Sequence, residues 1–354
     1  MVGIYVGSTS GYSGKNLVAM GLGLKFQKDG LNVGYIKPVG AVPVEKDGKM
    51  GDEDAFFVQD VLGLKEDPEL VTPVLVTEEF KTKAFGGLTH DLMGDIKRSY
   101  ETLSKGRDVT IVAGSGSMYS GKYCNVDAVE VVRTLGIKSI VIDRCSKELN
   151  YDYLVVLKDA LGDQFIGTIL NDIPADYMDE VKNRLAPFLE RSGVKVLGIL
   201  PRDPLLGAVQ VGELAQRLGG RVVTAKDKAD RVVENFLIGS MQVENFMTHF
   251  RKNKNTAIIM GGDRSDVQLV ALEGECPCLI LTGNIYPNDI ILTRAEVKEI
   301  PIIIVRDDTF TMAKKMDAIM SRLKLRDLVK IQQGAQVVSN NVDIPYIKEQ
   351  LGLK

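Results

Sequence analysis

Short apolar runs alternate with amphipathic stretches of helical length along most of the chain. In the first half the runs are short, rich in β-branched residues and bounded by turn-forming residues, which is typical of buried strands. These strand candidates are 2–6, 33–36, 109–113, 139–142, 166–170 and 195–200. Strands separated by helices at this spacing predict a parallel sheet covered on both faces, and therefore an α/β fold.

A second series of the same kind follows, with strand candidates at 256–260, 278–281 and 302–305. Between the two series the pattern is less regular, and residues 226–231 form a charge run that suits a boundary. We therefore predict a first domain over 1–225, a smaller one over 226–330, and a C-terminal tail over 331–354.

Composition removes several classes of function. The formal net charge is −3 and no long basic stretch interleaves with aromatic residues, so nucleic-acid binding is disfavoured. No apolar run approaches the ~18 residues that a transmembrane helix needs, and membrane association is not expected. Four cysteines are too few for a disulfide scaffold and no signal peptide fits the N-terminus, which together indicate a cytoplasmic protein. With only two histidines, chemistry that needs histidine clusters is nearly excluded.

The clearest chemical signal is a glycine-rich loop directly after the first strand. The chain reads Gly7-Ser8-Thr9-Ser10-Gly11-Tyr12-Ser13-Gly14-Lys15-Asn16 and continues into a helical pattern. A strand, a glycine-rich turn and a helix N-terminus present several backbone N–H groups to one anion, and a lysine adds a mobile charge for outer phosphates. The alternative is a tight turn that needs glycine only for its backbone angles. The predicted phosphate-binding residues are Ser10, Gly11, Tyr12, Ser13, Gly14, Lys15 and Asn16.

This loop departs from the common P-loop in two ways. Six residues separate Gly7 from Gly14, whereas the common pattern has four. Asn16 also stands where Ser or Thr usually offers a hydroxyl to Mg²⁺. An asparagine carbonyl can contact the ion but is less favourably placed, so the second departure weakens the case for turnover.

Several further segments, taken together, resemble a known group. They are 35–40 (Tyr-Ile-Lys-Pro-Val-Gly), 52–55 (Asp-Glu-Asp-Ala), 169–171 (Ile-Leu-Asn) and 197–203 (Leu-Gly-Ile-Leu-Pro-Arg-Asp). In order and spacing they resemble dethiobiotin synthetases and cobyrinic acid a,c-diamide synthases. The chain is most similar to the dethiobiotin-synthetase-like N-terminal region of long bacterial phosphotransacetylases. Residues 261–266 (Gly-Gly-Asp-Arg-Ser-Asp) resemble the signature of the DRTGG domain that follows this region.

The resemblance implies a P-loop NTPase-like parallel sheet flanked by helices, followed by a smaller α/β domain of the DRTGG type. The chain leaves no room for the acetyltransferase domain of those proteins. We therefore expect their regulatory portion as a separate protein, and no acetyl transfer.

The resemblance also implies roles for individual residues. Lys37 matches the lysine that faces the reacting carbamate in dethiobiotin synthetase; the alternative is a solvated lysine at a strand end. Asp52 or Asp54 matches the Mg²⁺-binding aspartate, unless this is merely an acidic helix start. Asn171 matches a residue at the adenine edge, unless it only forms a turn, and Pro201 is placed at the same nucleotide site. With Asn16, the expected metal ligands are Asp52 and Asp54.

One further departure concerns catalysis. In the synthetases the strand corresponding to 109–112 ends in a glutamate that helps to hold Mg²⁺, whereas here Ala113 precedes Gly114. Alanine cannot ligate a metal, and Asp143 at the end of the next strand could substitute only if the geometry allows. Because Mg²⁺ supplies much of the barrier lowering in phosphoryl transfer, such a site is expected to bind nucleotide better than it hydrolyses it.

The second domain offers a separate set of candidates. Asp263, Arg264 and Ser265 follow one predicted strand and Asn284 follows the next. If these strands are parallel, the loops share one edge of the sheet, where a small ligand would fit. Alternatively, Asp263 or Ser265 caps the helix and Asp263 pairs with Arg264 for purely structural reasons.

Three functions stay open at this point. The first is a regulatory protein that binds ATP or a similar nucleotide with Mg²⁺. The second is an ATP-dependent ligase or amidoligase that uses Lys15, Lys37 and an aspartate, and the third is an assembly module with vestigial sites. Asn16 and Ala113 favour the first over the second. The resemblance further implies a homodimer, and a regulatory protein would act on a metabolic enzyme.

Overall fold

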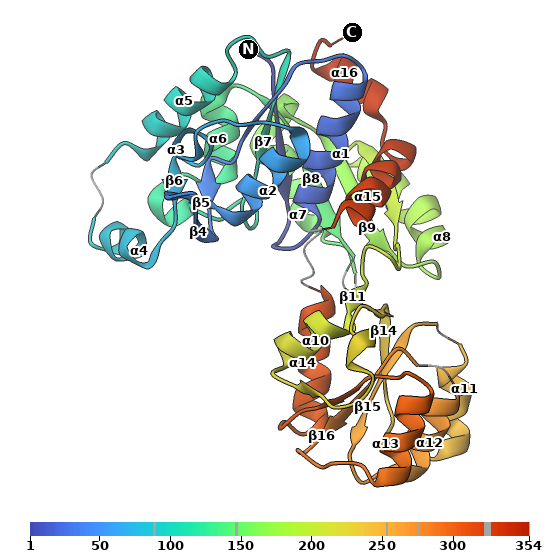
Figure 1. Ribbon diagram of the computed structural model, residues 1–354. Coiled ribbons are helices and arrows are strands. Elements are labelled where there is room, and N and C mark those ends of the chain that lie inside the picture. Colours follow the sequence, from blue (N-terminus) through green and yellow to red (C-terminus); the bar gives the residue numbers. More distant parts are fainter. Residues whose placement is uncertain (88–89, 146–147, 253, 275, 322–326, 354) are drawn as a thin grey trace. The chain divides into compact units, whose positions relative to one another are not determined.

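The computed structural model describes residues 1–87, 90–145, 148–252, 254–274, 276–321 and 327–353 (Figure 1). The chain divides into two compact units. The first comprises Met1–Arg202 together with Leu325–Lys354, and the second comprises Asp203–Lys324. Each unit has a central sheet flanked by helices, so the predicted α/β fold class is confirmed. None of the helices described is both long and apolar enough to cross a bilayer.

The sheet of the first unit is parallel and six-stranded, in the order β10-β9-β8-β1-β7-β2. Its interior strands are buried on both faces, which explains why they read as continuous apolar runs rather than as alternating ones. Each strand coincides closely with a predicted one: β1 (Gly3–Ser8), β2 (Val33–Ile36), β7 (Val109–Ala113), β8 (Lys138–Arg144), β9 (Phe165–Ile173) and β10 (Val196–Pro201).

Amphipathic helices connect these strands. In α6 (Ala128–Leu135), for example, the Asp127 side chain caps the N-terminus, the valines face the core, and Gly136 ends the helix with φ 64°. The others are α1 (Lys15–Lys28), α2 (Glu53–Leu62), α3 (Pro68–Val71), α4 (Glu78–Phe85), α5 (Leu92–Leu103), α7 (Tyr151–Leu161), α8 (Met178–Glu180) and α9 (Ala186–Arg191), with a π-helical turn at Val181–Leu185. Short strand pairs join β3 (Val39–Gly40) to β6 (Val74–Leu75), and β4 (Pro43–Lys46) to β5 (Lys49–Asp52).

The second unit has a five-stranded sheet in the order β12-β17-β16-β15-β14. β14 (Asn235–Ile238), β15 (Thr256–Gly261), β16 (Leu279–Thr282) and β17 (Ile302–Ile304) are parallel, and β12 (Arg221–Val222) is antiparallel to β17. A separate pair joins β11 (Val209–Gln210) to β13 (Val232–Val233). Two apolar clusters form its core. The helices are α10 (Val211–Leu218), α11 (Val243–Phe250), α12 (Ser265–Glu273), α13 (Asp289–Val297) and α14 (Thr309–Ser321).

The boundary between the units differs from the one predicted near residue 225. The first unit ends at Arg202, because β11 and β12 already pair with strands of the second unit. The charge run at 226–231 therefore lies inside the second unit rather than between the two.

The C-terminal residues are not a tail but part of the first unit. They form α15 (Leu328–Asn341) and α16 (Ile344–Gln350). Val338 packs onto Gly21 of α1 so closely that a Cβ on this glycine would lie 2.8 Å from the valine Cβ. Lys348 pairs with Asp29 at 2.8 Å. The sparse apolar positions of this segment, such as Val338 and Ile347, are thus fully buried.

Candidate phosphate-binding site

The glycine-rich loop lies between the C-terminal end of β1 and the start of α1. Two of its residues are left-handed, Tyr12 with φ 57° and Gly14 with φ 104°. A side chain at Gly14 would collide with Asn171, since its Cβ would lie 2.4 Å from Nδ2. Gly14 is also the N-cap of α1 and offers no side-chain acceptor, so the first-turn N–H groups of α1 can bind an anion.

Side chains hold the loop in this shape. Within it, Ser13 Oγ donates to Ser10 O at 2.9 Å and lies 2.9 Å from Ser10 Oγ. From β9, Asn171 Nδ2 donates to Ser13 O at 2.9 Å, and from β8, Arg144 Nη1 donates to Tyr12 O at 3.3 Å. The loop is therefore anchored by its own hydroxyl groups and by two neighbouring strands.

Lys15 reaches back over the loop, and its hydrogen bonds to the described residues all go to neutral oxygen atoms. Its Nζ donates to Ser8 Oγ at 2.7 Å, to Gly116 O at 2.8 Å and to Ser10 O at 3.3 Å. Burial, assisted by the positive charge of Lys37 and opposed by Asp54, lowers the pKa of Lys15 to about 8. Because burial disfavours the charged form of Lys15, a nearby polyanion would strongly stabilise its ammonium group.

Lys37 and Asp52 form a buried ion pair beside this loop. Lys37 Nζ lies 2.6 Å from Asp52 Oδ1 and 3.4 Å from Asp54 Oδ2, and Lys37 and Asp52 are 3% and 1% exposed. Asp52 Oδ2 accepts two backbone N–H groups of the preceding turn at 2.9 and 3.0 Å, and Oδ1 accepts two from the first turn of α2 at 3.0 and 3.1 Å. Asp52 is thus the N-cap of α2 with its oxygens occupied, and Lys37 is not a solvated lysine.

Asp143 is engaged as well. It accepts a hydrogen bond from Thr9 Oγ1, and Asn150 donates to it from its backbone N at 2.7 Å and from Nδ2 at 2.9 Å. Ala113, at the end of β7, is buried. Among the residues described, no three His, Cys, Asp or Glu side chains gather closely enough to hold a metal ion. Asn16 and Asp54 stay predicted ligands of a Mg²⁺ ion that a nucleotide would carry, and Asp54 Oδ2 itself lies 3.4 Å from Lys37 Nζ.

The remaining predicted residues of this site lie at neighbouring strand ends. Asn171 is 8% exposed and commits one amide N–H to the loop, while Pro201 is exposed at the end of β10. Sequence reasoning missed three residues that shape the site: Ser8 and Gly116, which hold Lys15, and Arg144. Gly116 belongs to a Gly-Ser-Gly-Ser run after β7, and Arg144 ends β8, which were the available signals.

In the second unit, β15, β16 and β17 are parallel, so the loops that carry the predicted candidates do share one sheet edge. Arg264 pairs with Asp266 at 3.0 and 3.1 Å, not with Asp263, and also donates to Met241 O at 3.2 Å. Neither Asp263 nor Ser265 caps α12, whose N-cap position is Arg264 without a side-chain cap. Asn284 is left-handed with φ 55°.

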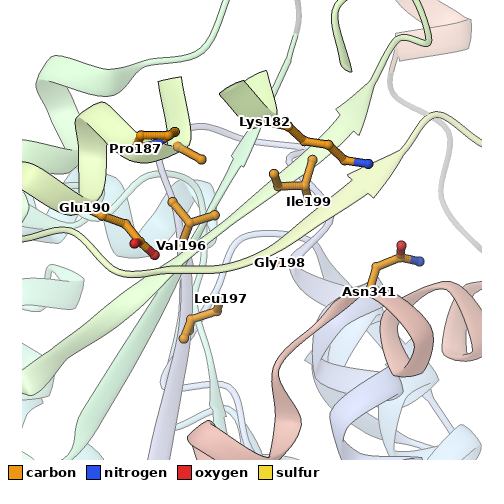
Figure 2. A pocket seen from close by; sticks show the side chains of 9 residues that line it. Lys182, Pro187, Glu190, Val196, Leu197, Gly198, Ile199 and Asn341 are labelled. Atoms are coloured by element: carbon orange, nitrogen blue, oxygen red, sulfur yellow. The ribbon is translucent and has the colours of Figure 1, made fainter. Parts of the chain in front are cut away.

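A cavity of about 500 Å³ flanks β10 on the outer edge of the first sheet (Figure 2). Lys182 and Glu190 line it on one side and Asn341 on the other, with Val196–Ile199 as its floor. None of its lining residues belongs to the glycine-rich loop. This cavity is therefore distinct from the candidate phosphate site.

Comparison with known families gives two consecutive matches. Residues 2–210 match the family described as AAA domain, and residues 213–319 match the DRTGG domain.

Curated relatives agree with these matches. The phosphate acetyltransferase of Nitrosomonas europaea is 23% identical over 360 residues, covering 96% of this chain and 50% of that protein. The ATP-dependent dethiobiotin synthetase BioD of Methanocaldococcus jannaschii is 29% identical over 147 residues, covering 40% of this chain and 65% of that protein. The chain thus spans about half the length of the phosphate acetyltransferases it matches, and the resemblance to both groups is confirmed.

Solved structures give weaker likenesses. The MinD cell division protein of Aquifex aeolicus has a TM-score of 0.36 at 14% identity, covering 58% of this chain and 84% of that one. The CBS and DRTGG regulatory region of Clostridium perfringens pyrophosphatase, complexed with diadenosine tetraphosphate, has a TM-score of 0.28 at 20% identity, covering 38% and 61%. TM-scores this low do not support an inference about function.

The Lys37–Asp52 pair generates a prediction about stability. Asp52→Asn leaves the buried Lys37 ammonium with only the more distant Asp54 carboxylate, 3.4 Å away, and we expect the free energy of unfolding to fall by about 3 kcal/mol. Asp60→Asn is the matched control, because Asp60 pairs with Lys46 at 2.9 Å on the surface, and its loss should cost about 1 kcal/mol or less. Urea denaturation measures both variants. Equal losses would show that the buried pair is not a structural anchor.

Proposed function

The chain belongs to the P-loop family described as AAA domain and carries a DRTGG domain after it, and from this premise we propose that it is a regulatory protein that binds ATP or a similar nucleotide. One observation carries the proposal. Among the described residues, the Lys15 ammonium donates to neutral oxygens, and it lies over a loop whose Gly14 leaves the N-terminus of α1 without a side-chain cap. A polyphosphate would place negative charge directly beside this lysine.

The surroundings of the loop favour binding over turnover. Ala113 replaces the expected carboxylate, and Asn16 replaces the expected hydroxyl. Asp52 and Asp143 already accept several hydrogen bonds each. Mg²⁺ would neutralise charge on the phosphates, held by Asn16 and Asp54. A magnesium ion with so few protein ligands positions the reacting groups poorly, so hydrolysis is slow.

The buried Lys37–Asp52 ion pair argues against transfer of a phosphoryl group to an acceptor substrate. Lys37 would have to leave Asp52, 2.6 Å away, to face a carbamate as the resemblance implies, and both groups are buried. We propose that Lys37 shapes the site through its charge and not by contacting substrate. Its positive charge helps to lower the pKa of Lys15, which makes the site more responsive to an incoming anion.

The nucleotide state is proposed to act on the second unit or on a partner. The matches to phosphate acetyltransferases support a metabolic enzyme as that partner. A homodimer in the cytoplasm, with no contact to nucleic acid or membrane, is the proposed working form. The sheet edge with Asp263, Arg264, Ser265 and Asn284 is the proposed place for a second ligand.

A second candidate function is an ATP-dependent ligase of the dethiobiotin synthetase or cobyrinate amidoligase type. The 29% identity to the BioD protein of Methanocaldococcus jannaschii favours it. An assembly module with vestigial sites is the third candidate. Binding of ATP distinguishes the assembly module from the other two candidates. The rate of ATP turnover distinguishes the regulatory protein from the ligase.

Removing the lysine tests the binding proposal. ATP with Mg²⁺ at about a hundred times its Kd should stabilise the wild type by about 2.7 kcal/mol, seen as a rise in Tm. Lys15→Ala should abolish this rise. Lys25→Ala is the matched control, because Lys25 lies on the same helix and pairs with Asp29 near the surface. If the wild type shows no rise with millimolar ATP and Mg²⁺, nucleotide binding is wrong.

The lowered pKa of Lys15 predicts a pH dependence. The free protein loses this proton as the pH rises through about 8, whereas the phosphate complex retains it. ATP affinity should therefore be constant below pH 7.5 and fall by up to about tenfold per pH unit above 8. Isothermal titration calorimetry between pH 6.5 and 9.5 measures this. Lys15→Arg keeps its charge throughout and should be flat, and a flat wild-type profile would refute the assignment.

Restoring the missing metal ligands tests the proposal that the site hydrolyses ATP only slowly. The wild type should hydrolyse ATP slowly, and Ala113→Glu with Asn16→Thr should raise kcat by about tenfold or more. Ala113→Gln with Asn16→Thr has nearly the same shape without the charge and should give no gain. Release of inorganic phosphate measures all three proteins. Rapid turnover by the wild type would support the ligase function instead.

A further inference from the structure

Three charged residues form a connection from the glycine-rich loop to the point where the chain leaves the first unit for the second. Arg144 Nη1 donates to Tyr12 O at 3.3 Å, and the same guanidinium contacts Asp172 Oδ2 through Nε and Nη2, each at 2.9 Å. Arg202 Nε donates to the other oxygen, Asp172 Oδ1, at 2.8 Å. We call Arg144, Asp172 and Arg202 the Arg–Asp–Arg bridge. Asp203, the next residue along the chain, begins the second unit.

The bridge is built on a distorted part of the sheet. Asp172 is left-handed, with φ 59°, and the pairing of β9 with β10 shifts register between Ile199 and Pro201. A non-glycine residue in this conformation costs roughly 1 kcal/mol, which the surroundings must offset. Arg202 is fixed through its backbone as well, because its N–H donates to Ile173 O at 2.8 Å.

The three side chains are partly exposed, at 30% for Arg144, 19% for Asp172 and 50% for Arg202. Ion pairs at such exposure contribute about 1 kcal/mol or less each. An exchange of ion-pair partners among these three side chains therefore costs little free energy. Asp172 gives one oxygen to each arginine, so loss of one guanidinium leaves the carboxylate to the other.

β10 contacts both segments of the first unit. The chain runs from its end through Arg202 into the second unit, and the C-terminal segment pairs with its middle directly after α15. There Asp343 N donates to Leu197 O at 2.7 Å and Gly198 bridges to Val342. Figure 2 shows Asn341 facing this strand, and a Cβ on Gly198 would lie 2.5 Å from Asn341 O. A shift at the end of β10 therefore acts on the strand from which the chain enters the second unit through Arg202.

We propose that the Arg–Asp–Arg bridge couples occupancy of the glycine-rich loop to the second unit. This inference rests on the proposed nucleotide binding and adds its route of regulation. A polyphosphate on the loop attracts the Arg144 guanidinium, which already reaches the loop at Tyr12 O. Asp172 then pairs with Arg202 alone. This pairing holds the end of β10 more firmly and orders the chain that follows from Asp203. Arg144 and Arg202 are positioning residues in this scheme.

Hydrogen exchange on the full chain, with and without ATP and Mg²⁺, tests the coupling. In the wild type, ATP should slow exchange at 9–16, where it binds, and by about fivefold or more at 203–222, since coupling energies of 1–3 kcal/mol are typical. Arg202→Gln removes the arginine at the end of the bridge that does not contact the loop. It should bind ATP within about twofold of the wild type, because the pair is half exposed, yet lose the effect at 203–222.

Three further variants complete the test. Arg202→Lys keeps a cation and should restore the effect, and Asp172→Asn, which tolerates the left-handed backbone, should abolish it. Arg184→Gln changes an exposed arginine outside the bridge and should behave as wild type. The coupling is overturned if ATP protects 9–16 but not 203–222, or if Arg202→Gln keeps the distant effect. No protection at 9–16 in the wild type overturns nucleotide binding itself, and the coupling with it.

Discussion

The site depends on one largely buried ammonium group, that of Lys15, whose hydrogen bonds in the described structure all go to neutral oxygen atoms. Lys15 is satisfied by Ser8, Ser10 and Gly116, all through neutral oxygens, and burial lowers its pKa to about 8. Hydrogen bonds to neutral acceptors hold the lysine in place but do not offset the cost of removing a charge from water. We infer that the loop is preorganised for a polyanion, because its glycine conformation and the N-terminus of α1 are already formed.

The neighbouring carboxylates determine what such a site can do. Asp52 caps α2 and pairs with Lys37, and Asp143 accepts hydrogen bonds from Thr9 and Asn150. Their hydrogen bonds stabilise the scaffold around the loop, and they are not readily given up to a metal. This arrangement is the basis for our proposal that the site binds a nucleotide rather than consuming it.

Periodicity and motif spacing were sufficient for the six strands of the first sheet and for the loop between β1 and α1. They were not sufficient for contacts between distant parts of the chain. Val338 packing on Gly21, and β12 pairing with β17, depend on tertiary contacts that local patterns do not encode. For the same reason the boundary was placed near residue 225 instead of after Arg202. The acidic residues at 52–54 were visible, but only hydrogen-bond geometry separates the cap, Asp52, from a ligand candidate, Asp54.

We propose above all that Lys15 and the loop around it bind a polyphosphate. A crystal structure of the chain grown with millimolar ATP and Mg²⁺ tests this most directly. The account predicts phosphate oxygens within hydrogen-bonding distance of Lys15 Nζ and of the first-turn N–H groups of α1, with Lys37 still paired to Asp52. A loop without nucleotide, in which Lys15 keeps its contacts to Ser8 and Gly116 under these conditions, would contradict it.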